Sequence, residues 1–454
     1  MFRIHRAVIA ICILFSLFAQ STYSLAESSL VTGMDAEQFN ALLREDRLML
    51  ARVEAPGLDD VGTELISLSP DGTRLLYVAE DGLYLYALED GSAIKLMPQT
   101  GESGLSQEQI ETLFARVEAV SISWSPDAAQ VLFSFPRRIF LDMRYSSNVW
   151  LCSTGTGEIT PLIAFPENFA PIKSYEGEPF MIPILAQFDG QLPHQADIML
   201  RGPYPSIADI EVGRIDLTTG ETALIGRYPN TMLGRLPCTL WRAGGNLVAV
   251  LASQKGPADY AGLAVMRDGE QFTTVTESSA AGSIFLHGSC MIAALDDTAI
   301  LYNATANDNR NEHRYPYLAE IHLDEQGAIT FDGFLALDLS TPADQRLKKI
   351  PFGEYDFVNS QALANPYNAV YSPDGAYMLL AAVAAGEPQL YIVNRHTGEC
   401  GIVSIPAYLH EDGTRPGFSY GAGTYSLRGI EWADHNRLLL TDGTSAHLYT
   451  FVKQ

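Results

Sequence analysis

A short turn between two apolar segments recurs along the chain and limits the folds that the sequence can adopt. Residues 66–78 read ISLSPDGTRLLYV, and the same pattern returns at 122–134 and 370–380. Proline at the first central position presets φ for a tight turn, and Asp and Gly tolerate the backbone angles that follow. The flanking residues have the composition of strands. Each copy therefore predicts a β-hairpin, and a degenerate copy at 430–440 predicts another one near the end of the chain.

A second, glycine-centred turn follows the hairpin in every repeating unit except the last and sets the size of the unit. It occurs at 89–92, 155–158, 218–221, 267–270, 324–327 and 396–399. The spacing of roughly 50 to 70 residues, with four strands to a unit, is typical of a β-propeller blade. Weaker first turns at 188–190, 243–246 and 295–297 complete the series. We therefore predict an all-β fold, a seven-bladed propeller, although a different interpretation of residues 176–330 would give six or eight blades.

The last repeat leaves room for only three strands before Gln454. Propellers of this kind commonly close the ring with a strand from the other terminus, and residues 47–53 are the candidate. The alternative is that these residues extend a short helix that Asp35 caps, with Gln38 as the capping-box partner. The expected organisation is thus an N-terminal segment over 27–60 and a propeller domain over 61–454.

Residues 1–26 have the features of a secretory signal peptide. A basic start precedes an apolar run over 7–19, and small residues at 24–26 suit cleavage. No later segment is apolar enough to span a membrane, so we expect a secreted protein, extracellular or periplasmic, and a monomer. The formal net charge of −25 makes nucleic acid an unfavourable partner, because an acidic surface repels phosphates.

The four cysteines after the signal peptide are too few for a disulfide scaffold in a chain of this length. Cys238 and Cys290 occupy matching positions, six residues before the first turns of neighbouring blades. They form one candidate disulfide. Buried free thiols are the alternative, because a disulfide requires Cα atoms within about 7 Å.

The long connections are expected to share one face of the disc. In a four-stranded blade, the turns after the first and third strands emerge on one face, and those are the short turns described above. The longer segments are of the other kind and cover 99–119 with its expected helix at 106–114, 136–147, 303–316, 332–367 and 406–426. Exposed aromatic residues in such loops provide binding area at low entropic cost. The candidate binding residues are Tyr355, Phe357, Tyr408, His410, Phe418 and Tyr420, although the same rings could instead plug the channel mouth.

Three sequence patterns partly match catalytic or metal-binding motifs. Residues 417–421 (GFSYG) match a nucleophile elbow around Ser419, but that motif needs a strand before it, a helix after it and a following Asp and His. Residues 308–312 lack the glycine and the distant glutamate of a calcium loop. His194, His313 and His410 show no zinc-type spacing. We therefore predict no catalytic residue, no metal and no cofactor.

The repeats resemble the WD40-like (PD40) repeats of TolB-type propellers, on residues 68–78, 124–127 and 371–375. The resemblance implies the fold more than the function, because related rings serve as protein-binding scaffolds, as substrate gates and, in oligogalacturonate lyases, as enzymes. The favoured hypothesis is a non-catalytic scaffold that binds a protein, peptide or glycan through its looped face. The alternative is a lyase or hydrolase with its site at the axial mouth.

Overall fold

The structure is a computed structural model that describes residues 35–55, 57–58, 66–79, 82–97, 121–134, 149–162, 182–190, 192–201, 210–228, 235–243, 245–253, 262–267, 271, 273–274, 289–295, 297–303, 317–350, 363–384, 387–404, 420–421, 424–425, 430–432, 437–441 and 446–454. Strands dominate these ranges, and the helices within them are short. None of those helices has the length and apolar character needed to cross a membrane.

Four groups of strands each form a separate four-stranded antiparallel sheet. We name every group after its first strand. The β2 group contains β2 (Ile66–Leu68), β3 (Arg74–Ala79), β4 (Gly82–Ala87) and β5 (Ala93–Met97). The β6 group contains β6 (Ser121–Trp124), β7 (Gln130–Ser134), β8 (Val149–Ser153) and β9 (Ile159–Pro161). The β10 group contains β10 (Ile182–Phe188), β11 (Gln195–Arg201), β12 (Ile210–Asp216) and β13 (Thr222–Tyr228). The β14 group contains β14 (Arg235–Ala243), β15 (Asn246–Ser253), β16 (Gly262–Arg267) and β17 (Thr273–Thr274).

The other groups are joined into one longer sheet. The β18 group contains β18 (Ser289–Leu295), β19 (Thr298–Asn303), β20 (Tyr317–Leu323) and β21 (Ile329–Asp338), with helix α5 (Ala343–Arg346) and β22 (Leu347–Ile350) beside it. The β23 group contains β23 (Leu363–Tyr371), β24 (Tyr377–Ala384), β25 (Glu387–Asn394) and β26 (Cys400–Ser404). The β29 group contains β29 (Ile430–Trp432), β30 (Arg437–Thr441) and β31 (Ala446–Lys453). A hairpin of β27 (Tyr420–Gly421) and β28 (Thr424–Tyr425) forms a sheet of its own.

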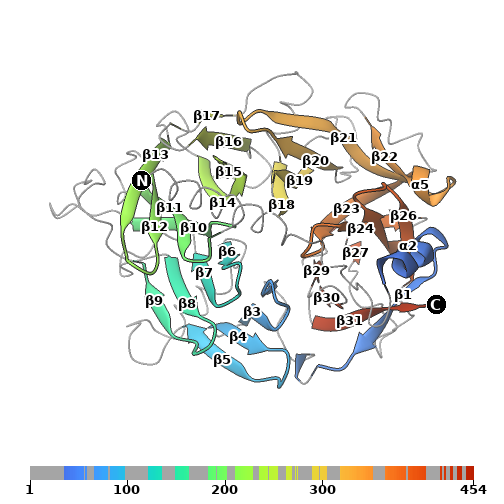
Figure 1. Cartoon of the computed structure of the whole chain (residues 1–454), viewed down its shortest axis with the longest axis horizontal. Coiled ribbons are helices and arrows are strands. Elements are labelled where there is room, and N and C mark those ends of the chain that lie inside the picture. Colours follow the sequence, from blue (N-terminus) through green and yellow to red (C-terminus); the bar gives the residue numbers. More distant parts are fainter. Residues whose placement is uncertain are drawn as a thin grey trace, which may run out of the picture.

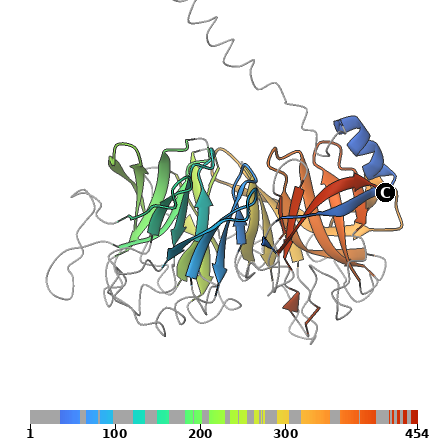
Figure 2. The ribbon, with the colours of Figure 1, turned by 90° about the horizontal axis from the view of Figure 1, so that it is seen from below.

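The groups stand side by side around a common centre and form a flat disc, with the first strand of each group on the inside (Figures 1 and 2). This arrangement is that of a β-propeller, the fold that the repeats predict. The weakly marked region between residues 176 and 330 follows the same plan, because the β10, β14 and β18 groups are built from it. The helix expected at 106–114 lies outside the described residues.

The recurring Ser-Pro-Asp turn is held by the same hydrogen bonds in three groups. The hydroxyls of Ser69, Ser125 and Ser372 each donate to the Asp carboxylate two residues later, at 2.6 Å. Each serine oxygen also accepts a backbone N–H from five residues later, at 2.9 Å. The turn thus satisfies its own polar groups locally, which is why a short sequence is enough to specify it.

The N-terminal segment pairs with the other end of the chain. Strand β1 (Leu48–Val53) runs antiparallel to β31 over its whole length, from Leu48 opposite Lys453 to Val53 opposite Leu448. The start of β1 also pairs in parallel with the end of the outer strand β26. Of the two alternatives for residues 47–53, a strand rather than a longer helix is therefore observed. Helix α2 (Ala36–Arg44) precedes it, and Asp35 caps this helix by accepting the Gln38 amide, as expected.

Apolar side chains fill the interfaces between neighbouring groups, which we call seams. Leu76 of the β2 group packs with Phe133 of the β6 group, and Leu132 on the other face of β7 packs with Ile198 of the β10 group. All four side chains are at most 1% exposed. Full burial of one such side chain contributes roughly 1.5–3 kcal/mol, so the seams are the main source of stability of the ring.

Candidate functional site

The structure places one of the predicted binding residues. Tyr355, Phe357, Tyr408, His410 and Phe418 lie outside the described residues. The backbone of Tyr420 lies in β27, opposite Tyr425 of β28. This hairpin projects from the face of the disc opposite helix α2 (Figure 2).

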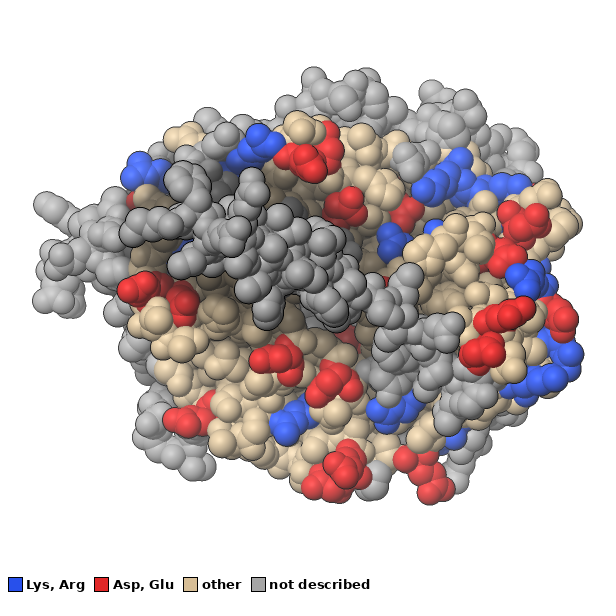
Figure 3. Space-filling view, viewed as in Figure 1, with Lys and Arg blue, Asp and Glu red and all other residues tan. Residues whose placement is uncertain are grey.

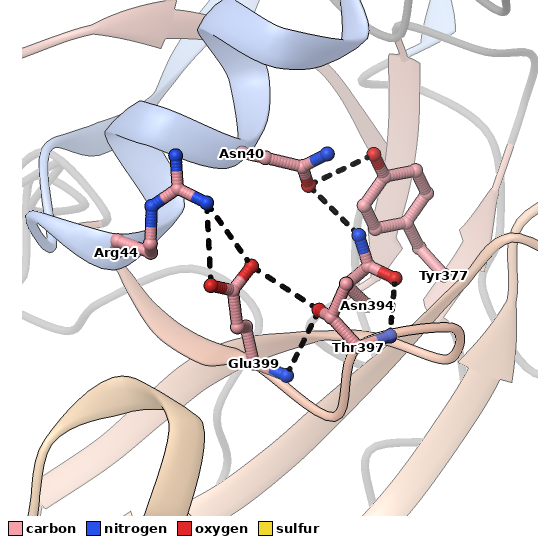
Figure 4. A network of polar contacts seen from close by, with 6 residues as sticks. All are labelled: Asn40, Arg44, Tyr377, Asn394, Thr397 and Glu399. Carbon is pink, nitrogen blue, oxygen red and sulfur yellow. Dashed lines mark hydrogen bonds and ion pairs between the residues drawn. The ribbon is translucent and has the colours of Figure 1, made fainter.

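Helix α2 identifies the face of the tight turns, because it docks on the turn between β25 and β26 (Figure 4). The Asn40 side-chain oxygen accepts from the Asn394 amide at 3.0 Å and from the Tyr377 hydroxyl at 3.1 Å. Arg44 pairs with Glu399 at 3.2 Å. Deeper in the same contact, Phe39 is fully buried. The N-terminal segment therefore covers part of the tight-turn face.

Strand ends show which connections leave from the opposite face. The chain leaves that face after the second and fourth strands of each group, and longer connections there span 98–120, 135–148, 163–181, 304–316 and 405–419. Residues 351–362 instead follow β22, which runs antiparallel to β21 and so returns toward the tight-turn face, and they end at the start of β23. On the tight-turn face, the hairpins are as short as 69–73 and 154–158. The described framework thus places most of the long connections on one face, as the sequence predicts. The expectation of a single long connection over 332–367 is wrong, because this range contains most of β21, α5, β22 and the start of β23.

Hydroxyl groups on the innermost strands connect neighbouring groups. The Ser67 hydroxyl accepts from the Trp124 indole across the first seam, and the Ser123 hydroxyl accepts from the Phe188 amide across the second, both at 2.9 Å. Ser67 and Ser123 hold equivalent positions, each two residues before the turn serine. Both of these seams therefore carry a polar contact near the axis in addition to their apolar packing.

Glu431 holds the same position on β29 as Ser67 and Ser123 do on their strands. Its Oε2 accepts from the Leu68 amide at 2.9 Å. The residue keeps a small exposed area. Burial of the carboxyl raises its pKa to about 7, and the Leu68 hydrogen bond offsets this only in part. A carboxyl that titrates near neutrality on an inner strand can exchange a proton with its surroundings.

A buried ion cluster occupies the seam between the β10 and β14 groups. Asp197, which is 1% exposed, accepts from the Arg214 Nε of its own group at 3.1 Å. Its second oxygen accepts from the Arg242 Nε of the next group. Gln187 lies directly opposite Asp197 in the β10–β11 ladder. Asp197 therefore ties two strand groups together through charge.

The seam between the β18 and β23 groups contains a second polar cluster. Glu320 Oε2 lies 2.9 Å from Lys349 Nζ and 3.9 Å from His322 Nε2. Across the seam, the Tyr371 hydroxyl is buried next to Glu320. Burial and the nearby Glu320 raise the pKa of Tyr371 far above its usual value. Arg395 stacks on the Tyr371 ring, 4.8 Å from its centroid.

Within the described ranges, no group of three or more His, Cys, Asp or Glu side chains could hold a metal ion. His194 lies 4.0 Å from Asp216, and His313 is outside these ranges. The backbones of Cys238 and Cys290 lie in β14 and β18, but the structure does not describe these side chains, so the candidate disulfide stays a prediction.

Cys152 and Cys400 are free and buried. Burial raises the pKa of both Cys152 and Cys400 to about 12, so they stay thiols at neutral pH. On the face seen in Figure 3, acidic and basic side chains of the described residues are interspersed rather than separated into fields of one sign.

The sequence analysis did not identify Glu431 or Asp197 as candidate functional residues, although the aligned repeats distinguish both of them. Once the repeats are aligned on their turns, Glu431 stands where Ser67 and Ser123 stand. Asp197 stands where Leu76 and Leu132 stand, because each follows the first turn at the same ladder position. A titratable residue at a position that is otherwise small or apolar is the pattern to look for.

No protein-family model matches the sequence, and no curated protein does so either. Several solved structures do match. An oligogalacturonate lyase in complex with manganese is 12% identical with a TM-score of 0.44, over 90% of this chain and 97% of that one. The Cps50 (Swd1) β-propeller domain of Myceliophteria thermophila is 12% identical with a TM-score of 0.45, over 88% and 99%. The β-propeller domain of the trilobed protease from Pyrococcus furiosus is 11% identical with a TM-score of 0.40, over 85% and 95%. Proteins of such different roles indicate neither a ligand nor an activity for this chain.

Proposed function

We propose that this chain is an exported scaffold that binds a protein, peptide or glycan and catalyses no reaction. Its binding surface would be the face opposite helix α2, formed by the long connections between strands. The observation that carries the proposal is the sorting of connections by face. Tight turns and α2 occupy one face, whereas most of the longer connections start and end at the other. Variable loops on a rigid framework are the usual way in which such folds carry binding sites.

The framework itself is proposed to be a seven-bladed ring that β1 closes. Each strand group would be one blade, and β1 would be the outer strand of the blade that β29, β30 and β31 begin. The ladder of β1 with β31, which runs from Leu48 to Val53, supports this assignment. Closure by chain pairing removes an unpaired strand edge, which would otherwise be open to aggregation.

The signal-peptide features of residues 1–26 support export, and we propose that the mature protein is a secreted or periplasmic monomer. The aromatic residues of 351–362 and 405–425 would make the contacts with the ligand. Aromatic side chains suit both sugars and peptides, because their rings give a large contact area with few rotatable bonds.

Binding can be tested with the mature protein on a glycan array and against peptides from the secreted fraction of its source. The site variant replaces Tyr408, Phe418 and Tyr420 with serine. The matched control is Leu192→Ser, an exposed residue on the tight-turn face. We expect the site variant to weaken binding of the selected ligand at least tenfold and the control to leave it unchanged.

The reverse result, with binding lost in the Leu192 variant alone, would contradict the choice of face. Turnover of a bound glycan or peptide would contradict the non-catalytic assignment. Stoichiometric transition metal in the purified mature protein would also favour an enzyme.

A further inference from the structure

Two equivalent hydrogen bonds cross different seams of the ring, one with a neutral acceptor and one with an ionisable acceptor. The Ser123 hydroxyl accepts from the Phe188 amide, and the Glu431 carboxyl accepts from the Leu68 amide, both at 2.9 Å. The two amides are themselves equivalent. Leu68 and Phe188 each end an innermost strand at the edge of a sheet and precede the first turn. Glutamate therefore performs at one seam the task that serine performs at the other.

The seam with the glutamate is the one where the beginning and the end of the propeller meet. Its two partners, Leu68 and Glu431, lie 363 residues apart in the sequence. Apolar contacts accompany the hydrogen bond, because Leu68 and Leu75 pack with Leu439 and Leu448. A long hydrogen bond of 3.4 Å from Arg437 to the Gly72 carbonyl also crosses this seam. A charge that forms at Glu431 is therefore placed where the ring depends on non-covalent contacts.

The groups around Glu431 give its charge little compensation. On the side of the β2 group, the ionisable residues that follow Leu68 in the sequence are Asp71 in the turn and Arg74 at the start of β3. Strand β30 contributes Arg437, and β23 contributes only tyrosines, Tyr367 and Tyr371. No Coulombic contribution from any of these groups alters the pKa of Glu431, which burial and the Leu68 hydrogen bond determine.

We propose that ionisation of Glu431 loosens the seam between the β29 and β2 groups, so that the ring closes more firmly in acid than at neutral pH. This goes beyond the proposed binding role, because it concerns the closure of the framework and does not depend on which ligand the loops take. When the seam opens, the Glu431 carboxylate becomes hydrated and the Leu68 N–H loses its hydrogen-bond acceptor.

The direction follows from proton linkage. The carboxyl has a pKa of about 7 in the closed seam and the ordinary value of 4.5 when water reaches it. Below the lower value both states are protonated, and closure is at its strongest. Between the two values only the closed seam keeps the proton, so each pH unit favours opening by up to about tenfold. Above about pH 7 both states are ionised, and the effect reaches its limit of roughly 300-fold.

Hydrogen exchange at single-amide resolution tests this in the full mature protein between pH 4.5 and 8. After correction for intrinsic exchange, the protection of the Leu68 amide should fall by one to two orders of magnitude by pH 7 and then level off. The Phe188 amide is the internal control, because its acceptor Ser123 does not titrate in this range. The Leu68 to Phe188 ratio should therefore show the whole change.

Glu431→Gln keeps an acceptor of the same shape without the charge, so its ratio should be independent of pH. A ratio that is constant with pH in the native protein would refute the proposal without any variant. The same pH dependence in Glu431→Gln would refute it as well. If that variant does not fold, Glu431→Ser, which installs the side chain of the equivalent positions, makes the same comparison.

Discussion

Replacement of Asp197 by leucine gives the sharpest test of how the seams are built. The equivalent ladder position holds Leu76, Leu132, Leu379 and Leu439 in other groups, all at most 1% exposed. If the position only required apolar packing, Asp197→Leu would stabilise the protein. The structure indicates the opposite, because Asp197 is the carboxylate between Arg214 and Arg242.

The expected cost follows from the charges that remain. The Arg242 side chain is 8% exposed and the Arg214 side chain is 26% exposed. Loss of one partner of a buried ion pair typically costs about 3–5 kcal/mol, against a gain of roughly 1–2 kcal/mol from added apolar burial. We therefore expect Asp197→Leu to lower the free energy of unfolding by about 2–3 kcal/mol.

Urea unfolding followed by tryptophan fluorescence measures this change. A double-mutant cycle with Arg242→Leu separates the charge effect from packing, because the double variant removes a cation together with the carboxylate. We expect the double variant to be at least about 1.5 kcal/mol more stable than the sum of the single effects. The reasoning would be refuted if Asp197→Leu were neutral or stabilising, or if the two changes were additive.

Three further predictions concern stability. Ala128 has a φ of 56° in its turn, and the equivalent Gly375 has a φ of 68°, a region that favours glycine. Ala128→Gly should therefore stabilise the protein by about 0.5–1 kcal/mol, and Gly375→Ala should destabilise it. Thermal unfolding would measure both changes. The buried Trp432 indole N–H donates to no acceptor among the described residues, and Val370 occupies on β23 the position at which Ser67 accepts the Trp124 indole N–H. Val370→Thr should therefore change the unfolding free energy by less than about 0.5 kcal/mol, whereas a buried hydroxyl without a partner costs about 1–3 kcal/mol. Arg44→Ala should cost less than about 1 kcal/mol in the same assay, because the Arg44 side chain is 50% exposed; a larger loss would contradict the minor role given to this ion pair.

Much of the framework could be predicted from the sequence, because its signals are local. In the Ser-Pro-Asp turns, a serine and an aspartate two residues apart bond to each other and to the backbone within five residues. Such a motif forms wherever it occurs in the chain, so it marks the hairpins reliably. The cap at Asp35 was predictable for the same reason, since its partner Gln38 is three residues away.

The predicted binding residues depend on longer connections, whose ends the framework fixes but whose side chains the sequence does not place. The spacing of turns shows that residues 405–419 leave from the face opposite α2. Nothing in the local sequence determines which ring of this stretch meets a ligand, because that depends on the packing of one connection against another. The assignment of Tyr408 and Phe418 to a binding surface therefore rests on the framework and on the experiment described above.

By itself, the sequence determined the β-propeller class, the tight-turn face and the capped N-terminal helix, because each of these depends on contacts a few residues apart. Only the tertiary structure decided how the seams are made. That residues 48–53 form a strand beside β31, that Asp197 meets Arg242 and that Glu431 meets Leu68 all depend on which residues face each other across neighbouring sheets. Those contacts join positions up to several hundred residues apart, so their energies depend on burial and charge that no local pattern specifies.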